Sequence, residues 1–276
     1  MNRLILVTGA TGFVGKAFIE QLEDSPVRIR LVLRSGSGSR IPCSSKIESV
    51  IYTDDLFAES VNWWESVCEG VDIFVSLAWY VDPKDYLHSL SNIDCLVGTF
   101  NIAKACVNSG VKRFFGIGTC FEYDLSSGYL STQTPLNPLT LYAASKASAF
   151  QILTRIFEPE NIKFVWGGLF YLYGFGDSDV RLGGYIHHQL SRGEPAELSH
   201  GLQIRDYLDV KEAASLLVQI MLSDQTGPVN ICSGNGKTVR EIAETIAGNY
   251  NRIDLLQFGA IKTKSVEPDI IVGILN

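Results

Sequence analysis

Tyr142 and Lys146 are the two residues whose types and spacing most directly suggest chemistry. They stand four positions apart in a stretch with helical character, and that spacing places both side chains on one face of a helix. A phenol has an ordinary pKa of about 10, and a nearby ammonium lowers this pKa because it stabilises the phenolate. The pair is therefore suited to proton transfer with a carbonyl or hydroxyl group near neutral pH. An exposed helical pair without a function would have the same spacing.

A hydroxyl group that could share this work precedes the pair. The apolar residues 114–118 predict a buried strand, and Thr119 follows at its carboxyl end. Open parallel sheets bind their ligands at this edge. We expect the Thr119 hydroxyl to donate a hydrogen bond to the same reacting oxygen as Tyr142. The alternative is a turn residue whose hydroxyl satisfies the backbone.

A glycine-rich turn at residues 8–15 (TGATGFVG) connects a predicted strand, residues 4–7, to a predicted helix. Gly9 permits the tight turn, Gly12 lets the backbone approach a pyrophosphate, and Gly15 allows close packing of helix on strand. The helix N-terminus offers free N–H groups and partial positive charge to phosphates. The turn thus predicts a dinucleotide site, although an ordinary glycine-rich turn is the alternative. The cofactor-binding residues expected here are Gly9, Thr11, Gly12, Phe13, Val14 and Gly15.

The end of the second predicted strand, residues 28–33, bears on which dinucleotide is bound. NAD-binding sheets carry an acid there to hold the adenosine ribose, whereas this sequence has Arg34 and Ser35. Arg34 would pair with a 2′-phosphate and Ser35 could donate a hydrogen bond to it, with Arg40 as a second candidate. The sequence therefore favours NADP(H), and NAD(H) stays possible. The alternative is that Arg34 is only a solvated charge.

Further cofactor contacts are expected after the third and fourth predicted strands, residues 47–52 and 71–77. Asp55 and Leu56 follow the third strand, where an adenine ring could rest. Asp55 could equally be a turn or capping residue. Leu77 and Ala78 end the fourth strand and complete the expected cofactor set, together with Tyr142 and Lys146.

The elements that must position these residues alternate between strand and helix. Further strands are predicted at 111–117 and 162–166, and helices at 14–23, 61–68, 93–109 and 139–157. Such alternation predicts a doubly wound α/β fold, with a parallel sheet covered on both faces. After residue 173, glycines become frequent and the elements shorter, with a helix at 211–222, a strand at 228–232 and a helix at 239–249.

This change in texture suggests two parts. We expect residues 1–168 to form a dinucleotide-binding Rossmann domain to which residues 205–232 return. Residues 169–204 and 233–276 would form a smaller substrate-binding lobe at the carboxyl edge of the sheet. The apolar residues 270–275 carry no stop signal, so the chain continues beyond them or its ordered part ends there.

Composition excludes several classes of function. Hydrophobic residues make up 46% of the chain and the net charge is −7, which suits a folded core and disfavours a nucleic-acid binder. The six cysteines form no CxxC pair and the four histidines have no metal-site spacing, so we expect free thiols and no metal. Leu4 to Val7 is too short an apolar run for a signal peptide, and no later run approaches the ~20 residues of a membrane span. A cytoplasmic protein without a membrane partner is expected.

Taken together, the motifs resemble those of the extended short-chain dehydrogenases/reductases. More narrowly, the chain resembles the NAD-dependent epimerase/dehydratase branch, which acts on nucleotide sugars. The family's TGATGFxG is residues 8–15 and its YxxxK is 142–146. Its NxxGTxN appears at 92–101 with extra residues after the first Asn, its RDFxxV at 205–210, and its YNxGSG at 229–234. The likeness covers nearly the whole chain.

The resemblance implies roles for several residues. Tyr142 would be the acid/base, Lys146 its partner and a ribose ligand, and Thr119 the hydroxyl donor. Arg205 would clamp the diphosphate of a nucleotide-diphosphate sugar, a bidentate task that suits a guanidinium. The alternative for Arg205 is a salt bridge with Asp206 or Asp209.

Departures from the family pattern narrow the range of reactions that we expect this chain to catalyse. Sugar-nucleotide 4,6-dehydratases carry Asp-Glu directly after the hydroxyl residue, where this chain has Cys120 and Phe121, with Glu122 one place further. Dehydration is therefore disfavoured. The family's RxFNxYGPG is GLFYLYGFG at 168–176, without its Arg, Asn and Pro, so the pocket differs from that of a common epimerase. The substrate-binding residues expected are Cys120, Phe121, Tyr171, Arg181 and Arg205.

Short strings at 203–206 and 258–261 resemble reductases that act on 4-keto sugar nucleotides. The favoured function is an NADP-dependent 4-ketoreductase of a nucleotide-linked deoxyhexose, with hydride delivered to C4 and Tyr142 as proton donor. The alternatives are a nucleotide-sugar 4-epimerase that retains NAD and a non-catalytic dinucleotide-sensing protein. The resemblance also implies a homodimer through a four-helix bundle of residues 93–109 and 139–157, with a monomer as the alternative.

Overall fold

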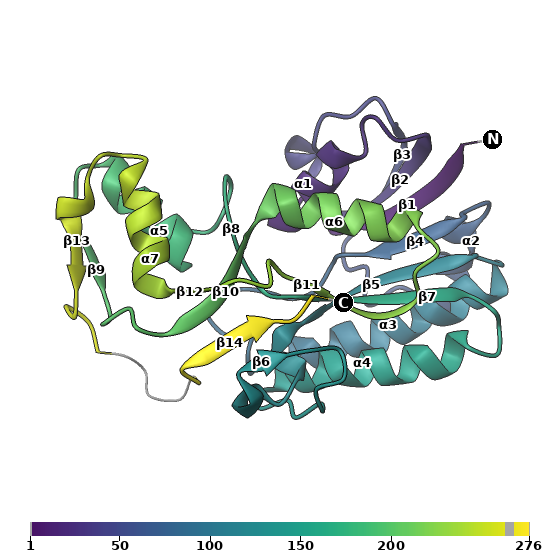
Figure 1. Cartoon of the computed structure of the whole chain (residues 1–276). Helices are drawn as coiled ribbons and strands as arrows, with labels where there is room; N and C mark the ends of the chain where they lie inside the picture. The colour runs from purple at the N-terminus through teal and green to yellow at the C-terminus, as the bar shows by residue number, and fades with distance from the viewer. Residues whose placement is uncertain (1, 263–267, 276) are drawn as a thin grey trace.

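Seven parallel strands form the main sheet of the computed structural model, which describes residues 2–262 and 268–275 (Figure 1). In chain order they are β1 (Arg3–Thr8), β2 (Val27–Arg34), β3 (Ile47–Thr53), β4 (Ile73–Ser76), β5 (Arg113–Thr119), β7 (Lys163–Leu169) and β11 (Gly227–Ile231). In space the order is β11-β7-β5-β4-β1-β2-β3, and every neighbouring pair is parallel. The strand order reverses between β1 and β4, which opens a crevice at the carboxyl ends of these strands.

Helices cover both faces of this sheet (Figure 1). One face carries α1 (Phe13–Gln21) and α6 (Val210–Leu222), and the other carries α2 (Val61–Cys68), α3 (Ser91–Asn108) and α4 (Leu141–Phe157). Successive strand residues point to opposite faces, so in β1 Ile5 and Val7 join the first core while Leu4 and Leu6 join the second. A strand buried on both faces is apolar along its whole length. The predicted doubly wound α/β fold is confirmed.

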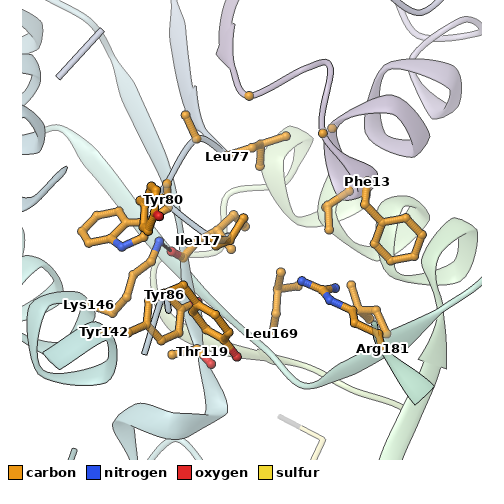
Figure 2. A pocket seen from close by; sticks show the side chains of 18 of the residues that line it. Phe13, Leu77, Tyr80, Tyr86, Ile117, Thr119, Tyr142, Lys146, Leu169 and Arg181 are labelled. Atoms are coloured by element: carbon orange, nitrogen blue, oxygen red, sulfur yellow. Dashed lines mark hydrogen bonds between the residues drawn. The ribbon is translucent and has the colours of Figure 1, made fainter. Parts of the chain in front are cut away.

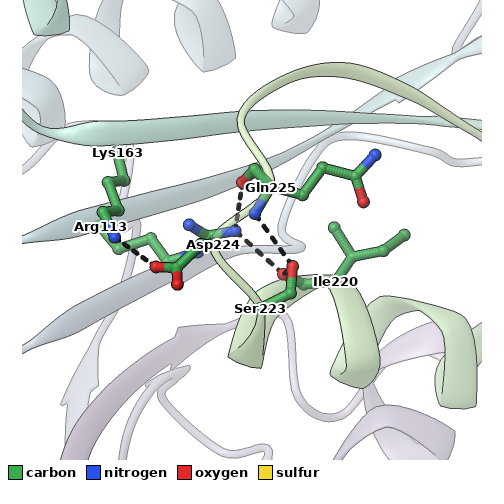
Figure 3. A network of polar contacts seen from close by, with 6 residues as sticks. All are labelled: Arg113, Lys163, Ile220, Ser223, Asp224 and Gln225. Atoms are coloured by element: carbon green, nitrogen blue, oxygen red, sulfur yellow. Dashed lines mark hydrogen bonds and ion pairs between the residues drawn. The ribbon is translucent and has the colours of Figure 1, made fainter.

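The chain leaves the main sheet after β7 and returns to it through α6 and β11. Arg113, at the start of β5, binds the end of α6 and the turn that follows it. The buried Arg113 donates from Nη2 to the carbonyl oxygens of Ile220 (2.9 Å) and Gln225 (2.6 Å) (Figure 3). Burial lowers the pKa of Arg113, and Asp224 opposes this effect. Asp224 itself pairs with Lys163 of β7. These contacts join the end of α6 to the amino-terminal edge of the sheet, far from the crevice.

A smaller lobe lies beside one end of the main sheet (Figure 1). It contains α5 (Leu182–Ser191), β9 (Ala196–Leu198), α7 (Val239–Gly248) and β13 (Leu256–Phe258). Ile186 and Leu190 of α5 pack against Ile242 and Ile246 of α7 to make a separate core. The helix at 239–249 was predicted within one residue, while the three-residue strands of the lobe were not predicted.

A second sheet connects the lobe to the main body. Its order is β12 (Gly236–Thr238), β10 (Ile204–Asp209), β14 (Ile270–Gly273) and β6 (Tyr129–Leu130), and β8 (Tyr171–Tyr173) also pairs with β10. The buried carboxylate of Asp206 accepts hydrogen bonds from the backbone N–H groups of Ser233, Gly234 and Gly273. One side chain of β10 therefore holds both the turn after β11 and the strand β14.

Candidate active site

A cavity of about 990 Å³ opens at the carboxyl edge of the main sheet, around the reversal between β1 and β4. Residues of β8, α5 and β10 line its other side. Of the expected site residues, it brings together Gly9, Thr11, Gly12, Phe13, Val14, Gly15, Arg34, Asp55, Leu56, Leu77, Ala78, Thr119, Cys120, Phe121, Tyr142, Lys146, Tyr171, Arg181 and Arg205. The remaining one, Ser35, lies in a separate shallow hollow with Gly36, Gly38, Ser39 and Tyr52.

The glycine-rich turn fits a dinucleotide because side chains there would collide with backbone. Gly9 has a φ of 77°, and a Cβ on it would lie 2.6 Å from the backbone nitrogen of Ala78. A Cβ on Gly15 would overlap the Gly9 carbonyl oxygen. Helix α1 begins at Phe13 with no side-chain cap and no acid in its first turn. Its first N–H groups are thus available to a phosphate.

The end of the cavity at which adenosine is expected carries both basic and acidic side chains. Arg34, at the end of β2, and Arg40, in a 3-10 helix at Gly38–Arg40, line it with Asp54 and Asp55. Oδ1 of Asp55 accepts a hydrogen bond from the N–H of Phe57 (2.9 Å). Asp55 therefore acts as a turn residue in this structure, which was one of its two expected roles.

Thr119, Tyr142 and Lys146 meet at the other end of the cavity, and Phe13 and Arg181 lie across the cavity from them (Figure 2). Thr119 is the last residue of β5, while Tyr142 and Lys146 occupy the first turns of α4. The side chain of Thr140 caps α4 by accepting a hydrogen bond from the Ala143 N–H (3.2 Å). The cap fixes where the helix starts, and so aims both catalytic candidates at the end of β5.

Burial controls the protonation of this group. It raises the pKa of the Tyr142 phenol above its ordinary value, and the charges of Tyr86 and Glu122 raise it further, while a hydrogen bond with Thr119 lowers it. Burial lowers the pKa of Lys146 to about 8, and the Glu122 carboxylate opposes this fall. Tyr142 is therefore a neutral phenol at neutral pH, which is the form that donates a proton.

Glu122 lies behind Thr119 and does not line the cavity. Its buried carboxylate accepts hydrogen bonds from the Thr119 N–H (2.7 Å) and from Nε1 of Trp166 (3.0 and 3.2 Å to its two oxygens). Burial raises its pKa to about 7. A Cβ on Gly118 would collide with Trp166, so the glycine makes room for this arrangement. Glu122 therefore holds the backbone of Thr119 from behind and does not face the cavity.

Arg205 of β10 and Tyr171 of β8 also line the cavity. The buried Arg205 donates from Nη1 to the carbonyl oxygens of Ile204 (2.9 Å) and Asp269 (3.2 Å), and its guanidinium carbon lies 5.7 Å from the Tyr171 ring centroid. Asp206 and Asp209, the alternative partners of Arg205, accept hydrogen bonds from backbone N–H groups.

A model of the NAD dependent epimerase/dehydratase family matches residues 5–232. The chain belongs to this family. The chain is therefore an NAD(P)-dependent enzyme of the epimerase/dehydratase type, as its motifs suggested.

Relatives and solved structures agree with this assignment. The chain is 23% identical to the dTDP-6-deoxy-L-talose 4-dehydrogenase (NAD(+)) of Aggregatibacter actinomycetemcomitans, over 90% of each chain. It is 24% identical to UDP-glucuronic acid decarboxylase 6 of Arabidopsis thaliana, over 89% of this chain and 74% of the relative.

Two epimerase structures share the fold. The UDP-N-acetylglucosamine 4-epimerase of Methanobrevibacter ruminantium, in complex with UDP-N-acetylmuramic acid, has a TM-score of 0.85 at 20% identity, over 100% of this chain and 90% of that one. The UDP-glucose 4-epimerase of Thermus thermophilus, in complex with NAD, has a TM-score of 0.82 at 20% identity, over 99% and 90%.

Among the cavity residues that sequence reasoning missed are two aromatic ones near the catalytic candidates. Trp79 and Tyr86 lie in the connection between β4 and α3 and line the cavity beside Lys146 and Tyr142. Trp79 directly follows the predicted cofactor residue Ala78, and this position was the one available signal. Irregular connections carry no periodicity from which side-chain directions could be predicted.

Two kinds of feature are absent from residues 2–262 and 268–275. Within these ranges no three His, Cys, Asp or Glu side chains gather in a way that could hold a metal ion. Within the same ranges, no helix has both the length and the apolar character needed to cross a membrane.

Proposed function

We propose that this enzyme is an NADP(H)-dependent reductase of a 4-keto-deoxyhexose carried on a nucleoside diphosphate. One observation carries the proposal. The reacting end of the cavity combines Thr119, Tyr142 and Lys146, and Cys120 and Phe121 stand where a dehydratase would need two carboxylates. Glu122, the nearest acid in sequence, is bound to the Thr119 N–H and to Trp166. Carbonyl reduction needs a proton donor and no such carboxylate pair.

The bound dinucleotide would supply a hydride to C4 of the sugar. Thr119 and Tyr142 would bind the C4 oxygen, and Tyr142 would donate its phenolic proton as negative charge develops there. The ammonium of Lys146 would stabilise the phenolate that is left. These interactions favour the reaction because they strengthen as charge builds up on oxygen. The raised pKa of Tyr142 keeps its proton in place until that moment.

Two features support a deoxysugar nucleotide as substrate. Arg205 and Arg181 both line the cavity, and guanidinium groups suit a diphosphate. Phe121, two residues after Thr119, and Tyr171 form an aromatic surface with ring centroids 6.0 Å apart, which favours a methyl group over a hydroxymethyl group. The relative named as a 4-dehydrogenase of a 6-deoxyhexose nucleotide supports the same substrate class.

The preference for NADP(H) depends on Arg34 and Arg40, which line the adenosine end of the cavity. NAD(H) is the other possibility, since the printed name of the 4-dehydrogenase relative carries NAD(+) and one solved epimerase holds NAD. A reductase must release its oxidised cofactor in each turnover, so freely exchanging NADPH would fit both parts of the proposal.

A nucleotide-sugar 4-epimerase is the second candidate, because the solved structures with the same fold include 4-epimerases. Such an enzyme would use Thr119, Tyr142 and Lys146 twice, to oxidise and then to re-reduce C4. Family membership leaves the dinucleotide-sensing alternative without support.

We also propose an oligomeric state, a cellular compartment and a division of the chain into two parts. Ile93 and Val97 of α3 and Ile152 of α4 are 41%, 54% and 42% exposed, which suits a homodimer through these helices. The free thiols of the described cysteines suit the reducing cytoplasm. Residues 1–168 and 205–232 would bind the dinucleotide, and residues 169–204 and 233–276 the substrate.

The test begins with purified protein and no added cofactor. Any retained dinucleotide is identified, NADPH and NADH are titrated, and NADPH oxidation is followed with nucleotide-linked 4-keto-6-deoxyhexoses. Exchangeable NADPH and stoichiometric reduction at C4 are expected. Retained NAD with interconversion of C4 epimers and no net redox change would replace the proposal with the epimerase.

A further inference from the structure

The connection between β4 and α3 presents two aromatic side chains to the catalytic pair. Nζ of Lys146 lies 3.9 Å from the centroid of the Trp79 ring. The ring of Tyr86 meets that of Tyr142 edge to face, with centroids 5.0 Å apart and an interplanar angle of 79° (Figure 2). The proton transfer described above assigns no task to Trp79.

Trp79 is held firmly in this place. Its Nε1 donates to Oδ1 of Asn92 (2.8 Å), and Nδ2 of Asn92 donates to the carbonyl oxygens of Tyr86 (2.6 Å) and Ser89 (2.9 Å). Asn92 is fully buried at the start of α3. Moving the indole would leave a buried carboxamide oxygen without its donor, which is costly. The ring of Phe57 packs edge-on against Trp79, with centroids 6.2 Å apart.

The contact with Lys146 has the geometry of a desolvated cation–π interaction. A distance of 3.9 Å is well within the ~6 Å over which an aromatic face attracts a cation, and burial strengthens the attraction. The same ammonium donates to the Ile117 carbonyl oxygen (2.7 Å), which directs Nζ toward the end of β5. Trp79 and Ile117 therefore hold Lys146 from two sides.

An uncharged aromatic ring can stabilise the Lys146 ammonium without placing a negative charge near Tyr142, which a carboxylate cannot do. The titratable groups whose charges act on Lys146 are Glu122 of the turn after β5 and Cys95 of α3, and Tyr142 lies four positions before it on α4. Glu122 stabilises the ammonium, but its negative charge also raises the pKa of Tyr142 and so opposes phenolate formation. The π face of Trp79 stabilises the ammonium without adding a net charge beside the phenol.

We propose that Trp79 is a positioning residue, which holds the Lys146 ammonium beside Tyr142 and helps to keep it protonated in a buried site. The role of this contact in catalysis rests on the proposed function. The contact itself can be tested without substrate or cofactor.

The experiment uses the full chain with 13C-labelled lysine and no ligand. A proton over an aromatic face is shifted upfield, so the Hε signals of Lys146, assigned by their loss in Lys146→Arg, are expected upfield of the other lysines. Trp79→Phe keeps an aromatic face and should retain much of this shift. Trp79→Leu should abolish it and lower the pH midpoint of Lys146 titration by about one pH unit. Trp63→Leu, which removes a tryptophan of α2 that packs on Trp64, should change neither.

Wild-type protein without an upfield Lys146 signal overturns the proposal, whether or not any variant folds. A Trp79→Leu variant in which Lys146 titrates as in the wild type also overturns it. With active enzyme, Trp79→Leu should move the basic limb of the kcat/KM profile to lower pH, which a merely structural role would not do. If the wild type shows the upfield signal but reduces no 4-keto sugar nucleotide, the proposed function fails while the contact stands.

Discussion

The two halves of the cavity differ in how far main chain and side chains determine their shape. The proposed dinucleotide half includes the backbone of the glycine-rich turn and of the carboxyl ends of parallel strands, and its shape depends on the absence of side chains at Gly9 and Gly15. The proposed sugar half consists of side chains such as Phe121, Tyr171 and Arg205, which come from short elements with aromatic contacts between them. Main-chain groups bind the diphosphate that all dinucleotides share. Substrate-binding side chains can be replaced one at a time without moving the main chain.

This difference predicts different responses to mutation. A substitution of Gly9 or Gly15 in the dinucleotide half forces neighbouring main chain to move, so fold and cofactor binding should fail together. A substitution in the other half should change substrate affinity or choice while the cofactor still binds. The predictions that follow test this contrast in order of decreasing expected effect.

The largest effect is expected where the halves meet. Tyr142→Phe removes the proton donor and should lower kcat for ketone reduction by about 10²–10⁴-fold. Binding of NADPH, followed by fluorescence, should change little. Tyr129→Phe, at an exposed position in β6, is the matched control. Full activity in Tyr142→Phe would remove Tyr142 from the mechanism.

Gly15→Ala should be next, because its Cβ would overlap the Gly9 carbonyl oxygen and lie 2.8 Å from Cα of Ala10. We expect the Kd for NADPH to rise by about 100-fold, together with a lower Tm, since overpacking costs about 1–3 kcal/mol. Gly248→Ala places a Cβ where no atom lies within 4 Å and should leave both quantities unchanged. Near-normal binding in Gly15→Ala would contradict the claim that this half is fixed by backbone sterics.

Arg205→Lys tests the side-chain half. Lysine keeps the charge but loses the planar fork that grips two oxygens, so KM for the nucleotide sugar should rise about tenfold or more with the Kd for NADPH unchanged. Arg192→Lys, in a surface pair with Glu194, serves as the control. An equal weakening of cofactor and sugar binding would mean that the halves are not independent.

The smallest effect is expected at Arg34. Arg34→Ala removes one partner of a 2′-phosphate, so Kd for NADPH should rise about tenfold while Kd for NADH stays within about twofold. Arg28→Ala removes a nearby cation of β2 that pairs with Glu48 on the surface and should affect neither dinucleotide. A parallel loss of both affinities would assign Arg34 a structural role.

The sequence signals for the expected site residues were local. The apolar run of β1, the three glycines and the start of α1 lie within 20 residues of one another, and the spacing of Tyr142 and Lys146 is fixed by the helix itself. All but one of the expected site residues consequently line one cavity. Ser35 does not, because the chain turns away at Gly36, where φ is 77°.

The site residues and short strands that were not predicted depend on contacts between segments that are distant in the sequence. Trp79 meets Lys146 across 67 positions, and Glu122 is buried by Trp166 across 44. No local pattern encodes such pairs. The short strands β8, β9, β12 and β13 have three residues each, too few to show alternation. These short segments are strands because each forms backbone hydrogen bonds with a strand from another part of the chain.

The position of β14 has a consequence for synthesis of the chain. This strand lies between β10 and β6, and Asp206 binds the N–H of Gly273 at its end. The main sheet has all its strands once residue 231 is made, whereas the second sheet lacks an inner strand until residue 273 follows. At ordinary translation rates this interval is about 2–8 s. The main sheet, with the proposed dinucleotide site, can thus fold before the second sheet that carries Arg205 is complete, and chains truncated within this interval should bind the cofactor but not the sugar.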